Sequence, residues 1–190
     1  MEDKQIQKRA EVFLSEIGVS SFPVDVEEIC DKLDINLMYI PGIKKSFSVD
    51  AFITSDFKMI IADEESAKKY VRRHRFSVAH ELAHMYLHKD CYPQNLKGID
   101  DYIKYENSVN GTEEYQANMF AGFVLVPAAE LGRQMTIEFG DDIEEGVRRS
   151  NPGELADSFA SLSSYFDVSG EVIQRRVIHE YKKFKSWIGI

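Results

Sequence analysis

Cysteine is scarce in this chain of 190 residues, which has only Cys30 and Cys91, far apart and in no CxxC pair. This scarcity excludes a disulfide framework and a cysteine zinc site, and it predicts the reducing cytoplasm as the setting. Positive charge is also in deficit, because 23 Lys and Arg residues face 32 Asp and Glu residues, a formal net charge of -9. Broad contact with nucleic-acid phosphates is therefore disfavoured, and we expect no direct nucleic-acid binding.

Long apolar runs are missing as well. The longest, residues 120–126, stops at Pro127, far short of the ~20 residues that a transmembrane helix needs. Residues 1–14 mix charges with isolated apolar side chains and lack the apolar core of a secretory signal. We therefore expect no export and no membrane contact. The 44% of hydrophobic residues is enough for one ordinary core, which predicts a single domain over residues 1–190.

The spacing of apolar residues predicts a mostly helical α+β fold with a small β-sheet. Helices are expected at residues 3–17, 25–33, 64–88 and 112–126, with a helical C-terminal region at about 150–190. Strands are expected at residues 35–40, 51–54 and 57–62, the last two forming a hairpin around Ser55-Asp56. Residues 89–111 are polar and contain Pro93, Gly98 and Gly111, which predicts a surface loop.

Four of the five histidines lie in residues 72–88, RRHRFSVAHELAHMYLH, where residues 80–84 read HExxH. On a helix the imidazoles of His80 and His84 lie about 40° apart in azimuth and about 6 Å apart in rise, so both can reach one metal ion. Glu81 points about 100° away from His80, which suits a carboxylate that acts on water. His88 lies about 12 Å in rise from His80, too far to share that ion. It is expected to support the site from the helix end or to contact the substrate.

A catalytic zinc ion needs three protein ligands and one open position. The metzincin pattern would place the third histidine at residue 90, which is Asp90, so that pattern is excluded. A glutamate from a second helix is the alternative, and Glu113 and Glu114 are adjacent candidates near the start of the helix expected at 112–126.

Two motifs in this order resemble the ImmA/IrrE family of metallopeptidases. The first is HELAH with Arg75-Phe76 before it, and the second is ExxANxFAxxxLxP over residues 114–127. The resemblance implies a zincin-like metallopeptidase domain with its core at about 24–130, a sheet beside the HExxH helix and a helical tail. It also implies that Glu114 is the third ligand and that Asn118 orients a ligand. Gln116 replaces the second glutamate of the family motif.

The function that the resemblance implies is a zinc-dependent endopeptidase with a protein substrate. Zn²⁺ would be held by His80, His84 and Glu114, and Glu81 would be the catalytic base. The implied substrate is a helix-turn-helix repressor, cut to relieve repression in a mobile element or a stress response. Arg75, His88 and Asn118 are expected to contact the ligands or the substrate.

Several points stay open in the sequence. An extended substrate is expected to pair with the strand at 57–62, taken as the outer strand. The donor to the oxyanion is unresolved, and the eligible residues are Tyr86, Tyr105, Tyr115, Tyr165 and His179. Cys91 is more simply a free loop thiol than a metal ligand. Two alternatives to a peptidase are a zinc-stabilised module that binds a repressor or antitoxin without cutting it, and a DNA-binding regulator with a helix-turn-helix in residues 162–177.

Overall fold

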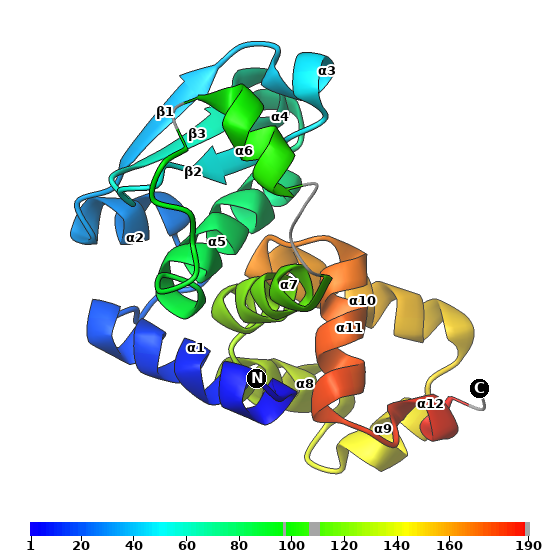
Figure 1. Cartoon of the computed structure of the whole chain (residues 1–190). Coiled ribbons are helices and arrows are strands. Elements are labelled where there is room, and N and C mark those ends of the chain that lie inside the picture. Colours follow the sequence, from blue (N-terminus) through cyan, green and yellow to red (C-terminus); the bar gives the residue numbers. More distant parts are fainter. Residues whose placement is uncertain (97, 107–110, 189–190) are drawn as a thin grey trace. The chain divides into compact units, whose positions relative to one another are not determined.

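The computed structural model describes residues 1–96, 98–106 and 111–188. It consists of two compact units, Met1–Val124 and Leu125–Ile190 (Figure 1). The chain is mostly helical with one small sheet, as the sequence predicts. The single domain expected over the whole chain stays a prediction. Among the described residues, none of the helices is both long and apolar enough to cross a lipid bilayer.

The first unit contains the sheet and most of the elements expected from the sequence. Its strands are β1 (Asn36–Ile40), β2 (Ala51–Ile53) and β3 (Met59–Asp63). Its helices are α1 (Asp3–Ile17), α2 (Val26–Lys32), α3 (Ile43–Phe47), α4 (Glu64–Lys69), α5 (Val71–Leu87), α6 (Ile99–Glu106) and α7 (Gly111–Leu125), of which α7 ends one residue into the second unit. The predicted helix signals act as expected, since α1 ends at the left-handed Gly18 and Asp25 accepts the N–H groups of Glu27 and Glu28 to cap α2.

The strand order in the sheet is β1-β3-β2. β2 and β3 pair antiparallel, which confirms the predicted hairpin, and β1 pairs parallel to β3. The expectation that the strand at 57–62 lies on the outside of the sheet is wrong, because β1 covers the free side of β3. That pairing joins segments about twenty residues apart, and local spacing carries no signal for it. The edge strand of the hairpin is therefore β2.

The prediction of a single helix at 64–88 is wrong, because the helix is interrupted at Tyr70 and forms two helices, α4 and α5. Asp63 caps α4 by accepting the N–H of Ser66, and Tyr70 has φ -129° and ψ 57°, outside the helical region. The absence of glycine and proline permits a continuous helix but does not require one. The break lets α4 follow directly from β3 while α5 contacts β2 and β3.

The surface loop predicted at 89–111 contains a helix, α6, so this prediction is partly wrong. Residues 97 and 107–110 of the predicted loop lie outside the described residues. The helix predicted at 112–126 is present as α7, but it begins at Gly111, so Thr112 lies inside it and is not its cap.

The second unit is entirely helical in its described part. It contains α8 (Ala128–Phe139), α9 (Ile143–Arg149), α10 (Pro152–Phe166), α11 (Gly170–Glu180) and α12 (Phe184–Trp187). The last three form the predicted helical tail, whereas the sequence pattern predicted neither α8 nor α9. Gly146 of α9 permits close contact with the end of α8, since a Cβ atom there would lie 1.9 Å from the carbonyl oxygen of Phe139. Asn151 and Glu154 form a capping box at the start of α10.

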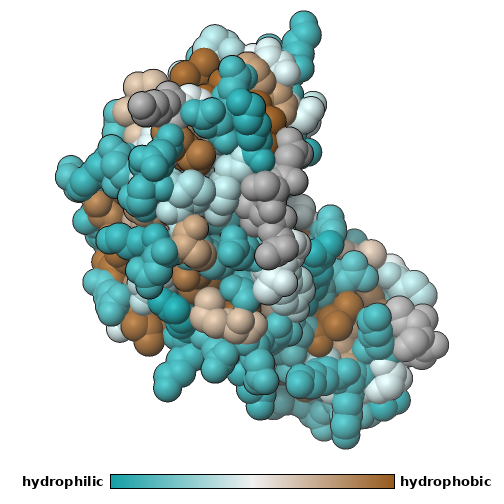
Figure 2. All heavy atoms as spheres, viewed as in Figure 1, coloured by the Kyte–Doolittle hydropathy of each residue, from teal (hydrophilic) through white to brown (hydrophobic). Residues whose placement is uncertain are grey.

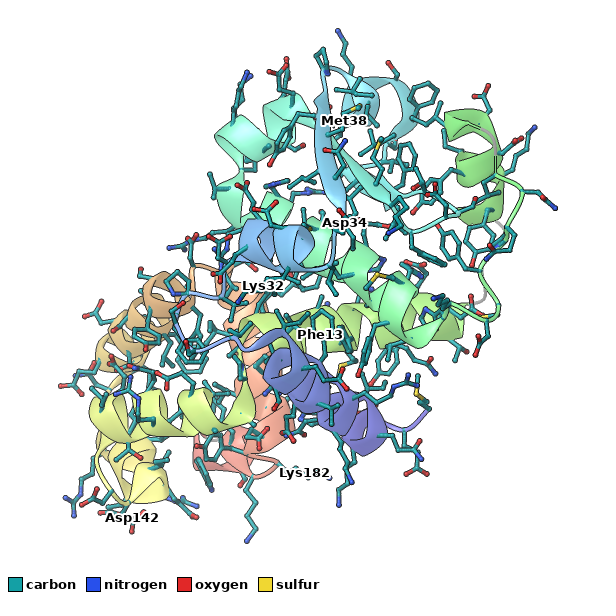
Figure 3. The ribbon with its side chains drawn as sticks, turned by 90° about the vertical axis from the view of Figure 1, so that its left-hand side faces the viewer. Phe13, Lys32, Asp34, Met38, Asp142 and Lys182 are labelled. Atoms are coloured by element: carbon teal, nitrogen blue, oxygen red, sulfur yellow. The ribbon has the colours of Figure 1, made fainter. Side chains whose placement is uncertain are left out.

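Phe13 shows how α1 joins the core of the first unit. Its ring packs edge-on against Tyr86 of α5 and Phe120 of α7, with centroids 4.9 and 5.4 Å apart. Figure 3 shows Phe13 on the inner side of α1, and its side chain is 1% exposed. This packing holds α5 and α7, the two helices that carry both sequence motifs, in one core. The visible surface in Figure 2 is mostly hydrophilic, with apolar atoms in small groups.

Asp50 connects several elements around the start of β2. Its carboxylate accepts hydrogen bonds from Lys44 of α3, Ser66 of α4 and Arg73 of α5. Burial tends to raise the pKa of this carboxyl, but the hydrogen bonds and charges of Lys44 and Arg73 outweigh it, so the pKa lies below its ordinary value. The ionised form is therefore the one that stabilises the fold.

We expect Asp50→Asn to lower the free energy of unfolding by about 1–3 kcal/mol at pH 7, the range for hydrogen bonds to charged groups. Since the pKa is lower in the folded state, the stabilisation is present above the unfolded pKa and is lost as pH falls through the folded pKa. Urea unfolding at several pH values should show a difference that is constant near neutral pH and shrinks in acid. The control Glu65→Gln removes an exposed ion pair with Lys69 and should change stability by less than about 0.5 kcal/mol. Equal losses in both variants would contradict the assignment.

Candidate active site

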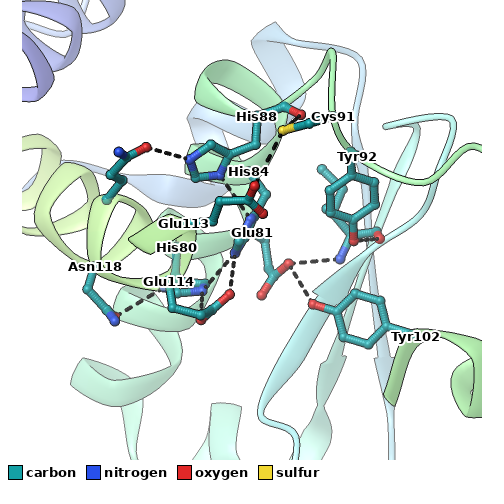
Figure 4. A network of polar contacts seen from close by, with 12 residues as sticks. His80, Glu81, His84, His88, Cys91, Tyr92, Tyr102, Glu113, Glu114 and Asn118 are labelled. Atoms are coloured by element: carbon teal, nitrogen blue, oxygen red, sulfur yellow. Dashed lines mark hydrogen bonds and ion pairs between the residues drawn. The ribbon is translucent and has the colours of Figure 1, made fainter. Parts of the chain in front are cut away.

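His80 and His84 lie one turn apart on α5, and Glu114 lies in the first turn of α7. The Nε2 atoms of the two imidazoles are 3.0 Å apart. Glu114 Oε2 lies 3.3 Å from His80 Nε2, and Glu114 Oε1 lies 3.3 Å from His84 Nε2 (Figure 4). The three side chains form a candidate metal site, in which one ligand atom from each lies within 4.8 Å of the others.

The chemistry of these donors fits a divalent cation. In a tetrahedral site with metal–nitrogen bonds near 2.0–2.1 Å, two ligand atoms are about 3.3 Å apart, close to the separations of the three side chains. Glu114 Oε1 is buried and has no hydrogen-bond partner within the described part of the chain, although it faces His84 Nε2. A bound cation would satisfy this oxygen together with both ring nitrogens.

The electrostatics of the cluster favour the forms that bind metals. Contact with His80 and then His84 holds the pKa of the Glu114 carboxyl far below its ordinary range, so it is ionised. Burial lowers the pKa of the His84 imidazole, and Glu114 opposes this only in part. A neutral imidazole beside a carboxylate is the state in which both groups act as ligands.

The outer ring nitrogens of both histidines also have partners. His80 Nδ1 lies 3.2 Å from Asn118 Oδ1, one helical turn after Glu114 on α7. His84 Nδ1 lies 3.2 Å from His88 Nδ1, and His88 Nε2 lies 3.1 Å from Gln116 Oε1. Thus Asn118 and His88 contact the two imidazoles from outside the cluster, and His88 is not one of the three clustered side chains.

In the view of Figure 4 the Glu81 carboxylate lies between the metal cluster and the sheet. Its carboxylate oxygen Oε2 accepts the N–H of Ile53 at 3.0 Å and the hydroxyl of Tyr102 at 3.3 Å. The hydroxyl of Tyr92 donates to the carbonyl oxygen of Ile53 at 3.0 Å. Glu81 is only 4% exposed, so its position is set by these contacts between α5, β2 and the segment after α5.

An apolar cavity of about 460 Å³ adjoins this part of the sheet. Its lining includes Ile43 and Phe47 of α3, Phe52 and Ile53 of β2, and Tyr102 of α6. Tyr102 stacks on Phe52 with ring centroids 4.6 Å apart, and its hydroxyl reaches Glu81. The side chain of Tyr102 therefore contacts both the cavity and Glu81, the candidate base.

The contacts described above for the metal cluster include none of the five eligible oxyanion donors. Tyr86 donates to Glu16, and Tyr115 donates to Asp3. The ring of Tyr105 packs edge-on against the ring of Tyr92. The remaining two, Tyr165 and His179, belong to the second unit. The identity of this donor stays open.

Two other sequence predictions have a defined environment. Arg75 Nη2 donates to the carbonyl oxygen of Val24 at 2.8 Å, which connects α5 to the segment before α2. Cys91 Sγ contacts the carbonyl oxygen of His88. Burial raises the pKa of its thiol, and Glu113 adds to the shift, which disfavours the thiolate form that binds metals.

Sequence reasoning missed Tyr92 and Tyr102. Both are almost fully buried, at 3% and 2% exposed, although they lie in a polar segment that was predicted to be a loop. The only available signal was the presence of three tyrosines in that segment, which also contains Tyr105. Their partners, Glu81 and Ile53, come from other elements and could not be found from spacing.

The HExxH helix beside a small mixed sheet, with a carboxylate from a second helix, defines a zincin-like metallopeptidase fold. The family model described as IrrE N-terminal-like domain, peptidase M78, matches residues 30–177, and the chain belongs to this family. This confirms the resemblance to ImmA/IrrE proteins. Comparison with curated proteins gives no match.

Substituting the adjacent glutamates separates the two candidates for the third ligand. Glu114→Ala should weaken zinc binding by at least about 100-fold, because the two imidazoles lose their only carboxylate partner in the cluster. Glu113→Ala should leave it within about threefold, since the Glu113 carboxylate contacts Cys91. Competition with a chromogenic zinc chelator measures both. Equal weakening in the two variants would rule out the assignment of Glu114 alone.

Proposed function

We propose that the chain is a zinc-dependent endopeptidase that cleaves a protein substrate, with Zn²⁺ held by His80, His84 and Glu114 and with Glu81 as the base. Membership of a peptidase family supports the reaction class. The three neighbouring donors, two imidazoles and one carboxylate, support zinc as the metal.

The position of Glu81 is the observation that carries this proposal. A purely structural zinc site is closed by four protein ligands. Among the described residues this cluster has three side chains, with a buried carboxylate one residue after the first of them. The contacts with Ile53 and Tyr102 hold the Glu81 carboxylate beside the cluster, and Glu81 is not one of the three clustered side chains. A carboxylate in this position supports catalysis better than structural metal binding.

Bound zinc supplies Lewis acidity, which makes water more acidic and polarises a peptide carbonyl. In the proposed reaction Glu81 accepts a proton from the attacking water and then donates it to the nitrogen of the leaving amine. Its buried setting keeps bulk water away from this carboxylate. Asn118 and His88 hold the two imidazoles in orientation by their outer nitrogens.

The outer edge of β2 is the proposed place for the substrate backbone. Asp50 and Thr54 hydrogen-bond to the β3 side through their backbone groups, so by alternation Ala51 and Ile53 direct theirs outward. An extended peptide can pair with these groups by strand addition. The outward N–H and carbonyl of Ile53 are already bonded to Glu81 and Tyr92, so pairing at Ile53 requires these contacts to exchange for substrate contacts.

We further propose that the substrate is a helix-turn-helix repressor, cut to relieve repression in a mobile element or a stress response. Two considerations support this choice: the ImmA/IrrE resemblance and the net charge of -9, which would attract a basic DNA-binding protein and speed association. The cytoplasm, where such a repressor acts, is the proposed location.

Glu81→Gln provides the test of the enzymatic proposal. Glutamine keeps an oxygen to accept the Ile53 N–H but cannot accept a proton from water, so kcat should fall roughly 10²- to 10⁴-fold. Zinc affinity should stay within about threefold, since Glu81 is outside the metal cluster. The assay incubates the zinc-loaded protein with the repressor encoded next to it and, in parallel, with a proteome-derived peptide library.

Cleavage by the wild type that vanishes in the variant would support the proposal. Equal binding of the repressor by both proteins, with no cleavage of either substrate set, would instead support the non-cleaving zinc module.

Tyr92 and Tyr102 form a matched pair for testing the substrate edge. Tyr92→Phe removes the internal partner of the Ile53 carbonyl, so a peptide that bonds to this carbonyl should bind more easily, and KM should fall about threefold to tenfold for a bond of about 1 kcal/mol. Tyr102→Phe removes the hydroxyl on Glu81 instead, and it should lower kcat by a similar factor with little change in KM. Steady-state kinetics on one peptide measures both. A higher KM in Tyr92→Phe would contradict pairing at Ile53.

A further inference from the structure

A buried line of polar side chains leads away from the metal cluster behind His84. His84 Nδ1 contacts His88 Nδ1 at 3.2 Å, and His88 Nε2 contacts Gln116 Oε1 at 3.1 Å. The three residues are 0%, 4% and 6% exposed, respectively. Figure 4 shows His88 beside His84 on the side away from Glu114. Neither His88 nor Gln116 is one of the three clustered side chains.

With both rings neutral and the amide oxygen of Gln116 facing His88, the hydrogen atoms in this line have one consistent arrangement. The amide oxygen of Gln116 only accepts, so His88 Nε2 must carry the hydrogen. A neutral imidazole has a single N–H, so His88 Nδ1 is bare and accepts. His84 Nδ1 must therefore donate, which leaves His84 Nε2 without a hydrogen and with its lone pair toward His80 and Glu114.

Gln116 provides the acceptor behind His88, since its amide oxygen faces His88 Nε2. The replacement of the family's second glutamate by Gln116 is thus compatible with orienting His84, because an amide oxygen and a carboxylate oxygen both accept.

We propose that His88 and Gln116 are positioning residues that fix His84 in the tautomer with hydrogen on Nδ1, so that Nε2 presents its lone pair to the metal ion. The inference rests on the metal centre of the proposed function but not on peptide hydrolysis. Without this line both tautomers of His84 would be populated, and only one of them leaves Nε2, the nitrogen that faces the cluster, free to bind a metal ion. His88 lies too far from His80 to be a ligand of the same ion, but it can still act by orienting His84.

The first measurement uses the metal-free full-length protein. Ring ¹⁵N NMR at pH 8 should show His84 with hydrogen on Nδ1 and a bare Nε2. In His88→Leu, which lacks an acceptor for His84, the Nε2-protonated form should become populated. His88→Asn offers an amide oxygen near the former Nδ1 and should restore the wild-type tautomer. A wild-type His84 with hydrogen on Nε2 would overturn the proposal.

The second measurement is zinc affinity by chelator competition at pH 8. His88→Leu and Gln116→Leu should bind zinc about 10- to 100-fold more weakly, the usual effect of removing a partner behind a metal ligand. His88→Asn should recover most of the affinity lost in His88→Leu, and Gln116→Glu, which keeps an acceptor, should bind at least as tightly as the wild type. Thermal unfolding of the metal-free variants shows whether each one folds.

The outcomes separate the two proposals. If the wild type binds no zinc, the metal centre fails while the NMR result still tests the tautomer. If the wild type binds zinc and the folded Leu variants bind it equally well, the positioning role of His88 and Gln116 is overturned and the metal centre stands.

Discussion

The angular spacing of side chains along α5 is the constraint on which the site depends. A helix turns about 100° per residue, so His80 and His84 share one face while Glu81 lies on another. The imidazoles face α7, which supplies Glu114 at 3.3 Å from each. Glu81 faces β2, where the N–H of Ile53 holds its carboxylate. One helix thus separates the groups suited to binding a metal from the group suited to moving a proton.

Buried polar groups impose a further constraint on the site, because they destabilise a fold unless they are paired. Around the cluster each ring nitrogen that faces away from the other ligands has its own polar partner, Asn118 for His80 and His88 for His84. Glu81 has donors from Ile53 and the Tyr102 hydroxyl. These partners come from the end of α5 and from α6, α7 and β2, so the packing of the first unit also sets the orientation of its reactive groups.

The sequence predicted those features that depend on residues close together in the chain, and it missed those that depend on residues far apart. HExxH predicted the pair on α5, and its match with the second motif selected Glu114 over Glu113. The hairpin and the C-terminal helices also followed from local pattern. The break at Tyr70 did not, because a run without glycine or proline permits either one helix or two. The central position of β3 did not either, since β1 reaches it from a distant segment.

By itself the sequence determined the features that lie within one helix: the two imidazoles on a common face, the carboxylate turned away from them, and a His88 too far along to join. Helix geometry makes these relations local, because rise and rotation per residue are constant. Only the tertiary structure decided which groups meet across elements, namely Tyr92 and Tyr102 at β2 and Gln116 behind His88. Such contacts depend on how helices and strands pack together, and no spacing in one segment encodes the distance to another.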